Sequence, residues 1–182
     1  MEDQLYYDMF QTRLENELLK ICTSSGMLEG VLLKSDDIDM KWKELAPEYM
    51  AQAVREIAEY PTVSVAWAGY AGMAVACWWN RDWNRLGGQP YSALQGPGGF
   101  DDMDDYIMKE ILGLIPGSVQ AGQITAAMQS CAQTAVTFIR QEKIEPQSPR
   151  AFYVFARAVR AMYGIGAAME LHRLGYEFRK LQ

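Results

Sequence analysis

The stretch that decides the fold is Pro61–Leu86, PTVSVAWAGYAGMAVACWWNRDWNRL, in which residues 62–79 carry no charge. A proline is tolerated in the first turn of a helix because its missing N–H has no partner there, and Gly87-Gly88 provides a stop signal. The stretch predicts one helix of roughly 25 residues, about 37 Å long. Because apolar residues occupy all of its faces, this helix is expected to be buried on most sides.

Small residues recur along the same helix. Ala68, Gly72 and Ala76 are four residues apart, so they form a stripe that allows a neighbouring backbone to come close. A similar stripe is present at Gly164–Ala168 near the end of the chain. Close packing between the long helices is therefore expected.

Residues 62–79 also have an alternative interpretation as a membrane span. Eighteen uncharged residues are at the short end of the spanning range, and small residues spaced by four are common in membrane helices. However, Thr62 and Ser64 make the stretch weakly hydrophobic, it contains no run of leucine or isoleucine, and no basic cluster flanks it. We therefore favour a buried core helix and expect no membrane partner.

The composition is typical of one globular domain covering residues 1–182. Of these residues, 49% are hydrophobic and 12% are aromatic. A chain of this length buries about two-thirds of its unfolded surface, which is enough for a single core. The three cysteines Cys22, Cys77 and Cys131 form no CxxC motif, so buried free thiols are expected. The acidic start MEDQLYYDMF lacks an apolar signal core, and a cytoplasmic location is expected.

Charge is unevenly distributed along the chain. Residues 1–60 contain 13 acidic and 6 basic side chains, whereas residues 140–182 contain 4 acidic and 8 basic ones. The net charge of −6 and the lack of a basic stripe argue against nucleic-acid binding, which depends on phosphate contacts. The opposite charges of the two ends predict that their helices meet. Arg157 and Arg160 are expected to pair with acids of residues 1–60 or with a partner subunit.

Apolar residues recur at helical spacing along most of the chain, and no segment shows the alternation of a strand. We therefore predict an all-α fold, a single-domain helical bundle of five or six helices, three of them long, with the helix at 61–86 buried in its centre. The first helix is expected at residues 3–22. Residues 27–34 give no clear pattern, and a helical turn is favoured there over a strand.

Caps, prolines and glycines predict the next boundaries. Ser35 starts an N-cap sequence before a short helix at 38–45, and Pro47 starts another helix that continues to Glu59 with Val54 facing inward. Residues 87–100 contain five glycines and two prolines and predict a long loop.

After this loop, helices are expected at 101–113, from Pro116 to about 142, and from 150 to about 180. The two prolines of Glu145–Pro149 predict a stiff linker between the last two of these helices. The helix that Pro116 opens should bury Ile124, Met128, Cys131, Ala135 and Phe138. The seam of the last helix should contain Phe152, Phe155, Val159, Met162, Gly166, Met169, Leu174, Phe178 and Leu181.

The sharpest chemical signal is the acidic cluster Asp101-Asp102-Met103-Asp104-Asp105, which contains a DDxxD pattern. It resembles the aspartate-rich motif of the all-α polyprenyl and terpene synthases, whose carboxylates hold Mg²⁺ against a diphosphate. The resemblance covers five residues and implies Asp101, Asp102 and Asp105 as metal ligands, since Mg²⁺ prefers oxygen ligands. The structural alternative is that these acids cap a helix and favour the positive end of its dipole.

A second acidic pair is Glu56 and Glu59, whose ExxE spacing places both carboxylates on one face of a helix. The spacing is similar to that in small all-α nucleotide pyrophosphatases, where ExxE and a later ExxD hold Mg²⁺. This similarity implies that Glu56 and Glu59 assist a metal bound at residues 101–105. The chain contains no GxSxG, P-loop, GxGxxG or HExxH motif, and its single histidine, His172, is expected at the surface beside Glu170 and Arg173.

Residues 79–85 form a small tandem repeat, WNR-D-WNR. On a regular helix the four-residue spacing would stack Trp79 on Trp83 and Arg81 on Arg85. Such a set could bind an anionic or planar ligand through cation–π contacts and paired hydrogen bonds. Alternatively, the arginines favour the negative end of the helix and the tryptophans pack under the glycine-rich loop.

Two functions remain open from the sequence. The first is a non-catalytic protein that acts through protein–protein contacts, as a homo-oligomer or with another protein, because the helices carry more apolar surface than a small bundle hides. The second is a Mg²⁺-dependent hydrolase or transferase acting on a phosphorylated or diphosphate substrate through residues 101–105, with Arg81 or Arg85 gripping phosphate. Only the second needs a cofactor. A pocket for an apolar ligand between the long helices is a third possibility.

Overall fold

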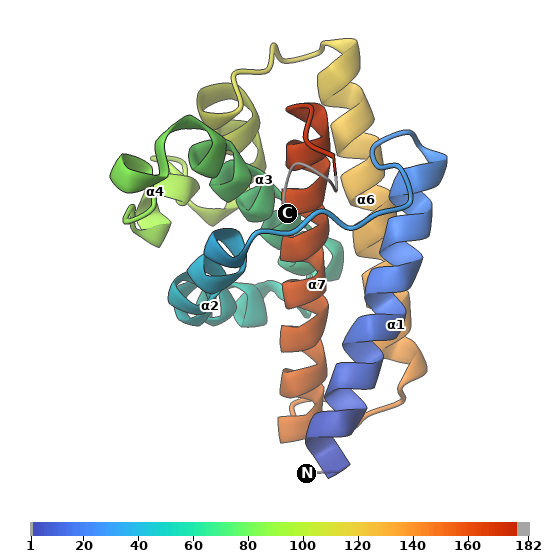
Figure 1. The fold of residues 1–182 in the computed structure, drawn as a ribbon. Coiled ribbons are helices and arrows are strands. Elements are labelled where there is room, and N and C mark those ends of the chain that lie inside the picture. Colours follow the sequence, from blue (N-terminus) through green and yellow to red (C-terminus); the bar gives the residue numbers. More distant parts are fainter. Residues whose placement is uncertain (1, 178–182) are drawn as a thin grey trace.

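The structure is a computed structural model that describes residues 2–177 (Figure 1). This part of the chain contains seven α-helices, one 3₁₀ turn, one π-helical turn and no strand. The prediction of an all-α bundle is confirmed, but there are more helices than the five or six expected, and five of them have 21 or more residues. The elements are α1 (Glu2–Ser24), α2 (Asp36–Glu56), α3 (Pro61–Leu86), α4 (Tyr91–Gln95), η1 (Phe100–Asp102), α5 (Met103–Tyr106), η2 (Ile107–Ile111), α6 (Val119–Gln141) and α7 (Pro149–Arg173).

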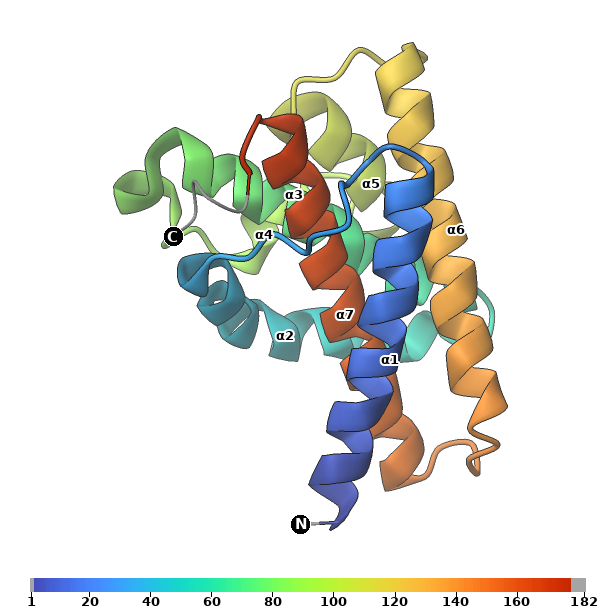
Figure 2. The same ribbon diagram turned by 45° about the vertical axis from the view of Figure 1, so that its right-hand side comes forward.

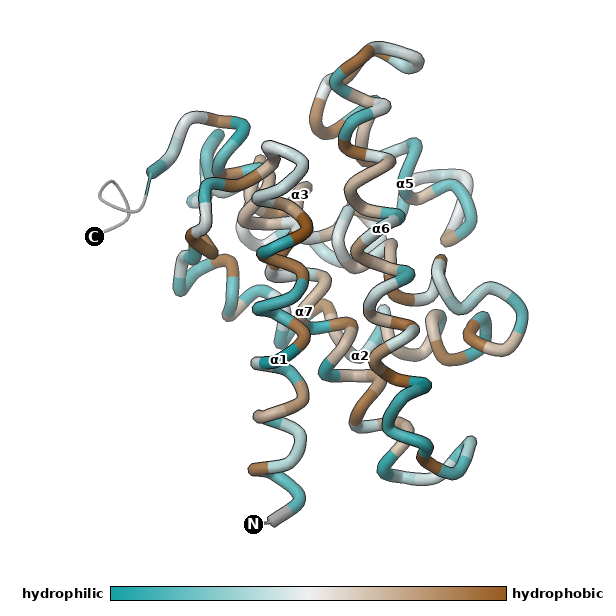
Figure 3. The backbone as a smooth tube through the Cα atoms, turned by 90° about the vertical axis from the view of Figure 1, so that its right-hand side faces the viewer, coloured by the Kyte–Doolittle hydropathy of each residue, from teal (hydrophilic) through white to brown (hydrophobic). Residues whose placement is uncertain are grey.

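Three long helices, α1, α6 and α7, are aligned with one another (Figures 1 and 2). α1 and α7 run in the same direction and α6 runs in the opposite one, while α3 crosses α7 and α2 lies to one side. Hydrophobic and hydrophilic residues alternate along α1 and α6, as expected for helices with one buried face (Figure 3). No helix within residues 2–177 has the length and apolar character that crossing a bilayer would require.

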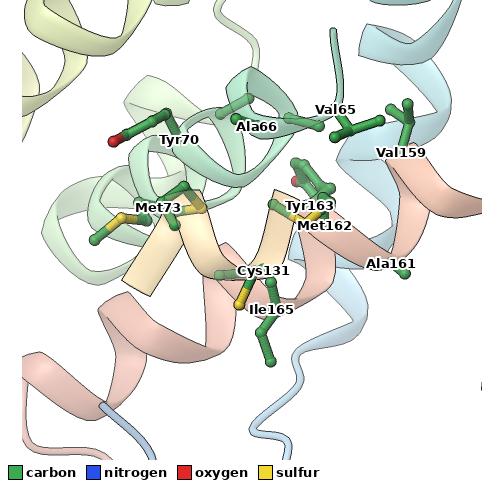
Figure 4. Packing of buried hydrophobic residues seen from close by; sticks show 14 of the residues in the cluster. Val65, Ala66, Tyr70, Met73, Cys131, Val159, Ala161, Met162, Tyr163 and Ile165 are labelled. Atoms are coloured by element: carbon green, nitrogen blue, oxygen red, sulfur yellow. The ribbon is translucent and has the colours of Figure 1, made fainter. Parts of the chain in front are cut away.

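The α3 helix has the bounds predicted from its proline and glycines. Every residue from Ser64 to Trp78 is buried except Trp67, which is half-buried. Val65 and Met73 of α3 pack in the same core as side chains of α6 and α7 (Figure 4). The prediction of a central helix enclosed by protein is therefore confirmed.

The crossing of α3 and α7 is a contact between backbones. A Cβ atom added at Gly166 would lie 1.8 Å from the carbonyl oxygen of Gly69, and one at Gly72 would lie 2.0 Å from that of Tyr163. Only glycine fits such an approach. The predicted stripe through Gly72 is used, but Gly164 is not part of the crossing, since the nearest atom to its added Cβ is in the Arg160 side chain at 3.4 Å.

The α2 helix runs unbroken through Pro47, so the prediction of two segments was wrong. Proline removes the hydrogen bond to the carbonyl four residues earlier, which belongs to Lys43. Pro47 and Lys43 are both exposed, so that carbonyl is on the side facing water, while Trp42 and Tyr49 anchor the helix on its buried side. Val54, predicted to face inward, is 41% exposed.

Residues 25–35 form no helix, so the helical turn favoured for 27–34 is absent. The segment passes across α7 on its way to α2 (Figure 1). Leu28 and Leu33 are buried and hold it against the core. Ser35 is at the N-cap of α2, although its side chain makes no capping hydrogen bond.

Three predictions for the second half of the chain also differ from the structure. The single helix expected at 101–113 is divided into η1, α5 and η2. Part of the expected loop 87–100 folds as α4. The α6 helix starts at Val119 rather than at Pro116, because the Ser118 hydroxyl accepts a capping hydrogen bond from the Ala121 N–H at 3.2 Å. The predicted face of α6 is confirmed, with Ile124, Met128, Cys131 and Ala135 buried and Phe138 partly buried.

The last helix ends at Arg173 rather than near residue 180. Gly175 has a φ of +95° and follows the last turn, and the Tyr176 N–H donates to the Leu171 carbonyl at 3.0 Å. This is the geometry of a glycine C-cap. Most of the predicted seam is buried, but Phe152 is 45% exposed, and the predictions for Phe178 and Leu181 fall outside the described residues.

Candidate functional site

The WNR-D-WNR repeat does not form the stacked set predicted from its spacing. Asp82 leaves the helical conformation, with φ −168° and ψ 86°, so α3 is kinked there. Its carboxylate accepts hydrogen bonds from the Arg85 backbone N–H at 3.3 Å and from the Arg85 side chain at 3.4 Å. Asp82 therefore acts as an N-cap for the last turn and separates the two halves of the repeat. Arg81 instead donates to the carbonyl of Ile111 at 3.0 Å.

The two tryptophans of the repeat also have different surroundings. The Trp79 indole N–H donates to a carboxylate oxygen of Asp37 in α2 at 3.1 Å, and its ring lies 5.5 Å from that of Tyr176. The Trp83 ring is close to Gly87, where an added Cβ would lie 2.8 Å from it. The structure thus does not bring Trp79, Arg81, Trp83 and Arg85 into one cluster.

The acidic cluster lies on two short consecutive elements, with Asp101 and Asp102 in η1 and Asp104 and Asp105 in α5. Burial raises the pKa of the Asp104 carboxyl, and the other three carboxylates are exposed. The Asp102 residue is at the N-cap position of α5 but its side chain makes no capping hydrogen bond.

The second acidic pair is separated by the end of a helix. Glu56 is the last residue of α2 and Glu59 lies in the turn that follows, so they do not share a helical face. Within residues 2–177, no three histidine, cysteine, aspartate or glutamate side chains converge as metal ligands would. The structure thus does not bring the predicted metal ligands Asp101, Asp102 and Asp105 together with Glu56 or Glu59.

A buried ion pair lies where α3, η2 and α7 meet. The Glu170 side chain is fully buried, and Arg173 donates to its two oxygens at 2.6 and 2.7 Å. Burial raises the pKa of Glu170, and the hydrogen bonds from Arg173 and the charge of Arg81 act in the opposite direction. The carbonyl of Ile111, which binds Arg81, also accepts a hydrogen bond from the Cys77 thiol at 3.6 Å.

The sequence predicted that His172 lies at the surface beside Glu170 and Arg173, and the structure confirms this only in part. His172 is half-buried and lies 3.4 Å from a carboxylate oxygen of Glu29, but Glu170 is in the core. Its position four residues after Gly166 is the signal that could have shown this, since the two share one face of α7. Both residues of this ion pair belong to α7, and the charge of Arg81 in α3 also favours the ionised Glu170 carboxylate.

The most exposed apolar side chains lie at the start of α6, in a surface that we call the α6 entry surface. It consists of Met108, Ile115, Pro116 and Val119, at the end of the molecule opposite the N-terminus (Figures 1 and 2). Ile115 is 74% and Val119 79% exposed. No other large hydrophobic residue among those described is exposed to this extent.

Local sequence explains why these side chains face water. Gly113 and Gly117 have φ values of +72° and +80°, so the chain reverses on both sides of Ile115. The Leu114 N–H donates to the Met108 carbonyl at 2.9 Å, and the buried Leu114 side chain anchors the loop. Ile115 is thereby directed away from the core.

A groove with a volume of about 360 Å³ adjoins this surface. Its apolar walls come from α6, η2 and the loop, and its rim carries the exposed side chains of Asp105 and Lys109. Neither charge takes part in an ion pair within the described residues. The residues that line the groove are Asp105, Met108, Lys109, Leu114, Pro116, Gly117, Ala121 and Thr125.

Sequence periodicity did not reveal this surface. It predicted that Pro116 opens a helix, which would have placed Ile115 at a helix start rather than at the tip of a loop. In comparisons with known proteins, no family model, no curated protein and no solved structure matches this chain.

Proposed function

We propose that this protein is a non-catalytic helical protein that acts through protein–protein contacts, and that two copies associate through the α6 entry surface. The observation that carries the proposal is the exposure of Ile115 and Val119, 74% and 79%, beside a groove with apolar walls. Burying side chains of this kind contributes about 1.5–3 kcal/mol each. An apolar patch with a polar rim is the usual composition of a contact surface.

The charges on the rim favour a second copy of this chain as the partner. A two-fold axis places the same surface of each copy against the other. Asp105 and Lys109 have opposite charges and lie on the same rim, so Lys109 of one copy can face Asp105 of the other, and the reverse. A surface with this arrangement is complementary to itself, which a surface with only one sign of charge is not.

The oligomeric state in solution tests this proposal. Light scattering coupled to size-exclusion chromatography, over a wide range of protein concentrations, should give the mass of a dimer for the wild type. Val119→Glu should give a monomer, because it places a charge in the apolar centre of the contact. Leu5→Glu is the matched control, since Leu5 is 62% exposed in α1, at the opposite end of the molecule, and its replacement should leave the dimer intact (Figure 1).

A charge exchange tests the geometry of the contact. Asp105→Lys alone and Lys109→Asp alone should each weaken the dimer, because each places like charges opposite one another. The double variant should restore it. A wild-type protein that stays monomeric at all concentrations would contradict the proposal, and so would a Leu5→Glu variant that dissociates as readily as Val119→Glu.

The proposed location is the cytoplasm, where thiols are kept reduced. It is supported by the three cysteines, Cys22, Cys77 and Cys131, which are buried and free. Fractionation of cells that express the full chain should recover it with cytoplasmic proteins, and recovery outside the cell would contradict this location.

A further inference from the structure

Two of the three cysteines are in contact, although they are far apart in the sequence. Cys22 lies in the last turns of α1 and Cys131 in the middle of α6, and their sulfur atoms are 3.6 Å apart across 109 residues. Both side chains are fully buried, and Cys131 lies in the core between α6 and α7 (Figure 4). Cys77 has a different partner, the carbonyl of Ile111. The structure therefore contains one thiol pair and one isolated thiol.

We propose that Cys22 and Cys131 are a redox-responsive pair that a hydroperoxide converts into a disulfide between α1 and α6. A disulfide has an S–S distance of about 2.05 Å, so the two sulfur atoms must approach each other from 3.6 Å. Because the two sulfur atoms are already in direct contact, rotation of the Cys22 side chain can supply this movement while its backbone stays bonded to Met27 and Leu28. Cys131 stays in place within the regular part of α6.

The contact between the two thiols makes them unequal in their reactivity toward a hydroperoxide. The hydrogen bond with Cys131, in which either sulfur can be the donor, lowers the pKa of the Cys22 thiol, against the opposing effect of burial. The same hydrogen bond and burial raise the pKa of Cys131. Because the thiolate is the form that reacts with peroxides, Cys22 is the sulfur expected to be oxidised first.

The reaction then has two balanced steps. In the first, the Cys22 thiolate attacks the outer oxygen of the hydroperoxide, the O–O bond breaks, and a sulfenic acid forms while the released alkoxide takes a proton and leaves as the alcohol. In the second, the Cys131 sulfur attacks the Cys22 sulfur, the S–O bond breaks, and the Cys131 proton leaves in a water molecule. Two thiols lose two electrons in total, and the hydroperoxide is reduced to an alcohol and water.

A groove of about 760 Å³ along the outside of α1 and α6 brings solvent near the pair. Its walls include Ile21 and Ser130, which are the sequence neighbours of Cys22 and Cys131. A small hydroperoxide such as hydrogen peroxide needs only a brief opening of the end of α1 to reach the sulfur atoms, whereas a bulky reagent needs a larger one.

Forming the bond has a measurable consequence for stability. The disulfide closes a loop of roughly 110 residues and restricts the unfolded chain, so the midpoint of thermal unfolding should rise by on the order of 10 °C. Reduction with dithiothreitol should reverse the rise.

The experiment treats the folded wild-type chain with hydrogen peroxide and analyses it by mass spectrometry and thermal unfolding. The expected product has lost two hydrogen atoms, gives a peptide that links Cys22 to Cys131, and unfolds at a higher temperature. Cys77→Ser is the matched control and should behave like the wild type. Cys131→Ser should form no disulfide and should accumulate a sulfenic acid at Cys22, which dimedone labels.

Circular dichroism of each variant before oxidation establishes that it is folded. Absence of the linked peptide from the oxidised wild type would overturn the proposal. So would a link through Cys77 in comparable amount, or dimedone labelling of Cys131→Ser at Cys77 instead of Cys22. These outcomes are independent of whether the protein forms a dimer through the α6 entry surface.

Discussion

Replacing Gly166 with alanine tests the contact on which the packing of α3 and α7 depends. The added Cβ would lie 1.8 Å from the carbonyl oxygen of Gly69, 2.6 Å from its carbonyl carbon and 2.8 Å from its Cα. An ordinary contact of this kind begins near 3.4 Å. All three atoms belong to the backbone, so no side-chain rotation relieves the overlap, and the helices must separate by more than an ångström.

The expected cost follows from that separation. A radial gap of 0.5–1 Å already removes about a quarter to a half of the attraction between packed atoms. The helices are lined here by buried side chains such as Val65, Met73, Met162 and Tyr163, which would lose contact (Figure 4). Overpacking that shifts backbone costs about 3 kcal/mol. Alanine gains about 1 kcal/mol over glycine in a helix, so the net loss of unfolding free energy should be about 2 kcal/mol or more.

Urea unfolding followed by circular dichroism measures this loss. Gly164→Ala is a matched control in the same helix, because its added Cβ has no neighbour closer than 3.4 Å, and Gly122→Ala is a second control in α6, where no atom lies within 4 Å. Both controls should stabilise the protein by about 0.5–1 kcal/mol. A Gly166→Ala variant as stable as Gly164→Ala would refute the close crossing.

Two ion pairs should differ sharply in their contribution to stability. Arg173→Met leaves Glu170 buried without its main partner and should cost about 3–5 kcal/mol at neutral pH. Burial raises the pKa of Glu170, so its carboxyl takes up a proton in the folded state as the pH falls, and a neutral carboxyl costs less to bury than a charged one. The loss of unfolding free energy in Arg173→Met should therefore be smaller at about pH 5 than at about pH 8. An equal loss in urea unfolding at both pH values would contradict this. By contrast, Arg157→Gln removes a pair with Asp8 at 2.6 Å whose carboxylate is half exposed, and it should cost only about 0.2–1 kcal/mol, decreasing with added salt. A larger loss that does not change with salt would show that Arg157 acts by packing instead.

Charge complementarity between the ends of the chain was correctly predicted from the sequence. Arg157 pairs with Asp8, and Arg160 lies 3.0 Å from a carboxylate oxygen of Asp39. Both acids belong to the first 60 residues, as the uneven distribution of charge indicated. The Cys22 and Cys131 thiols are buried and free, also as predicted, but their contact was not.

Short-range sequence patterns predicted the structure correctly wherever its physical cause is local. The α3 helix could be bounded because Pro61 and Gly87-Gly88 act on their own turns, and the buried face of α6 could be identified because helical periodicity repeats within a few residues. The same reasoning failed at Pro47, where an exposed carbonyl and buried neighbours allow the helix to continue, and at Asp82, whose carboxylate starts a new turn.

The remaining features depend on how helices cross, and no local pattern encodes a crossing. Gly69 and Gly166 meet because two helices distant in sequence approach at one point, while Gly164 on the same helix faces elsewhere. Glu170 is buried only because α3, with Cys77 and Arg81, covers that face of α7. Each of these positions depends on contacts between residues far apart in the chain. Those contacts form only when all the helices pack together around one shared core.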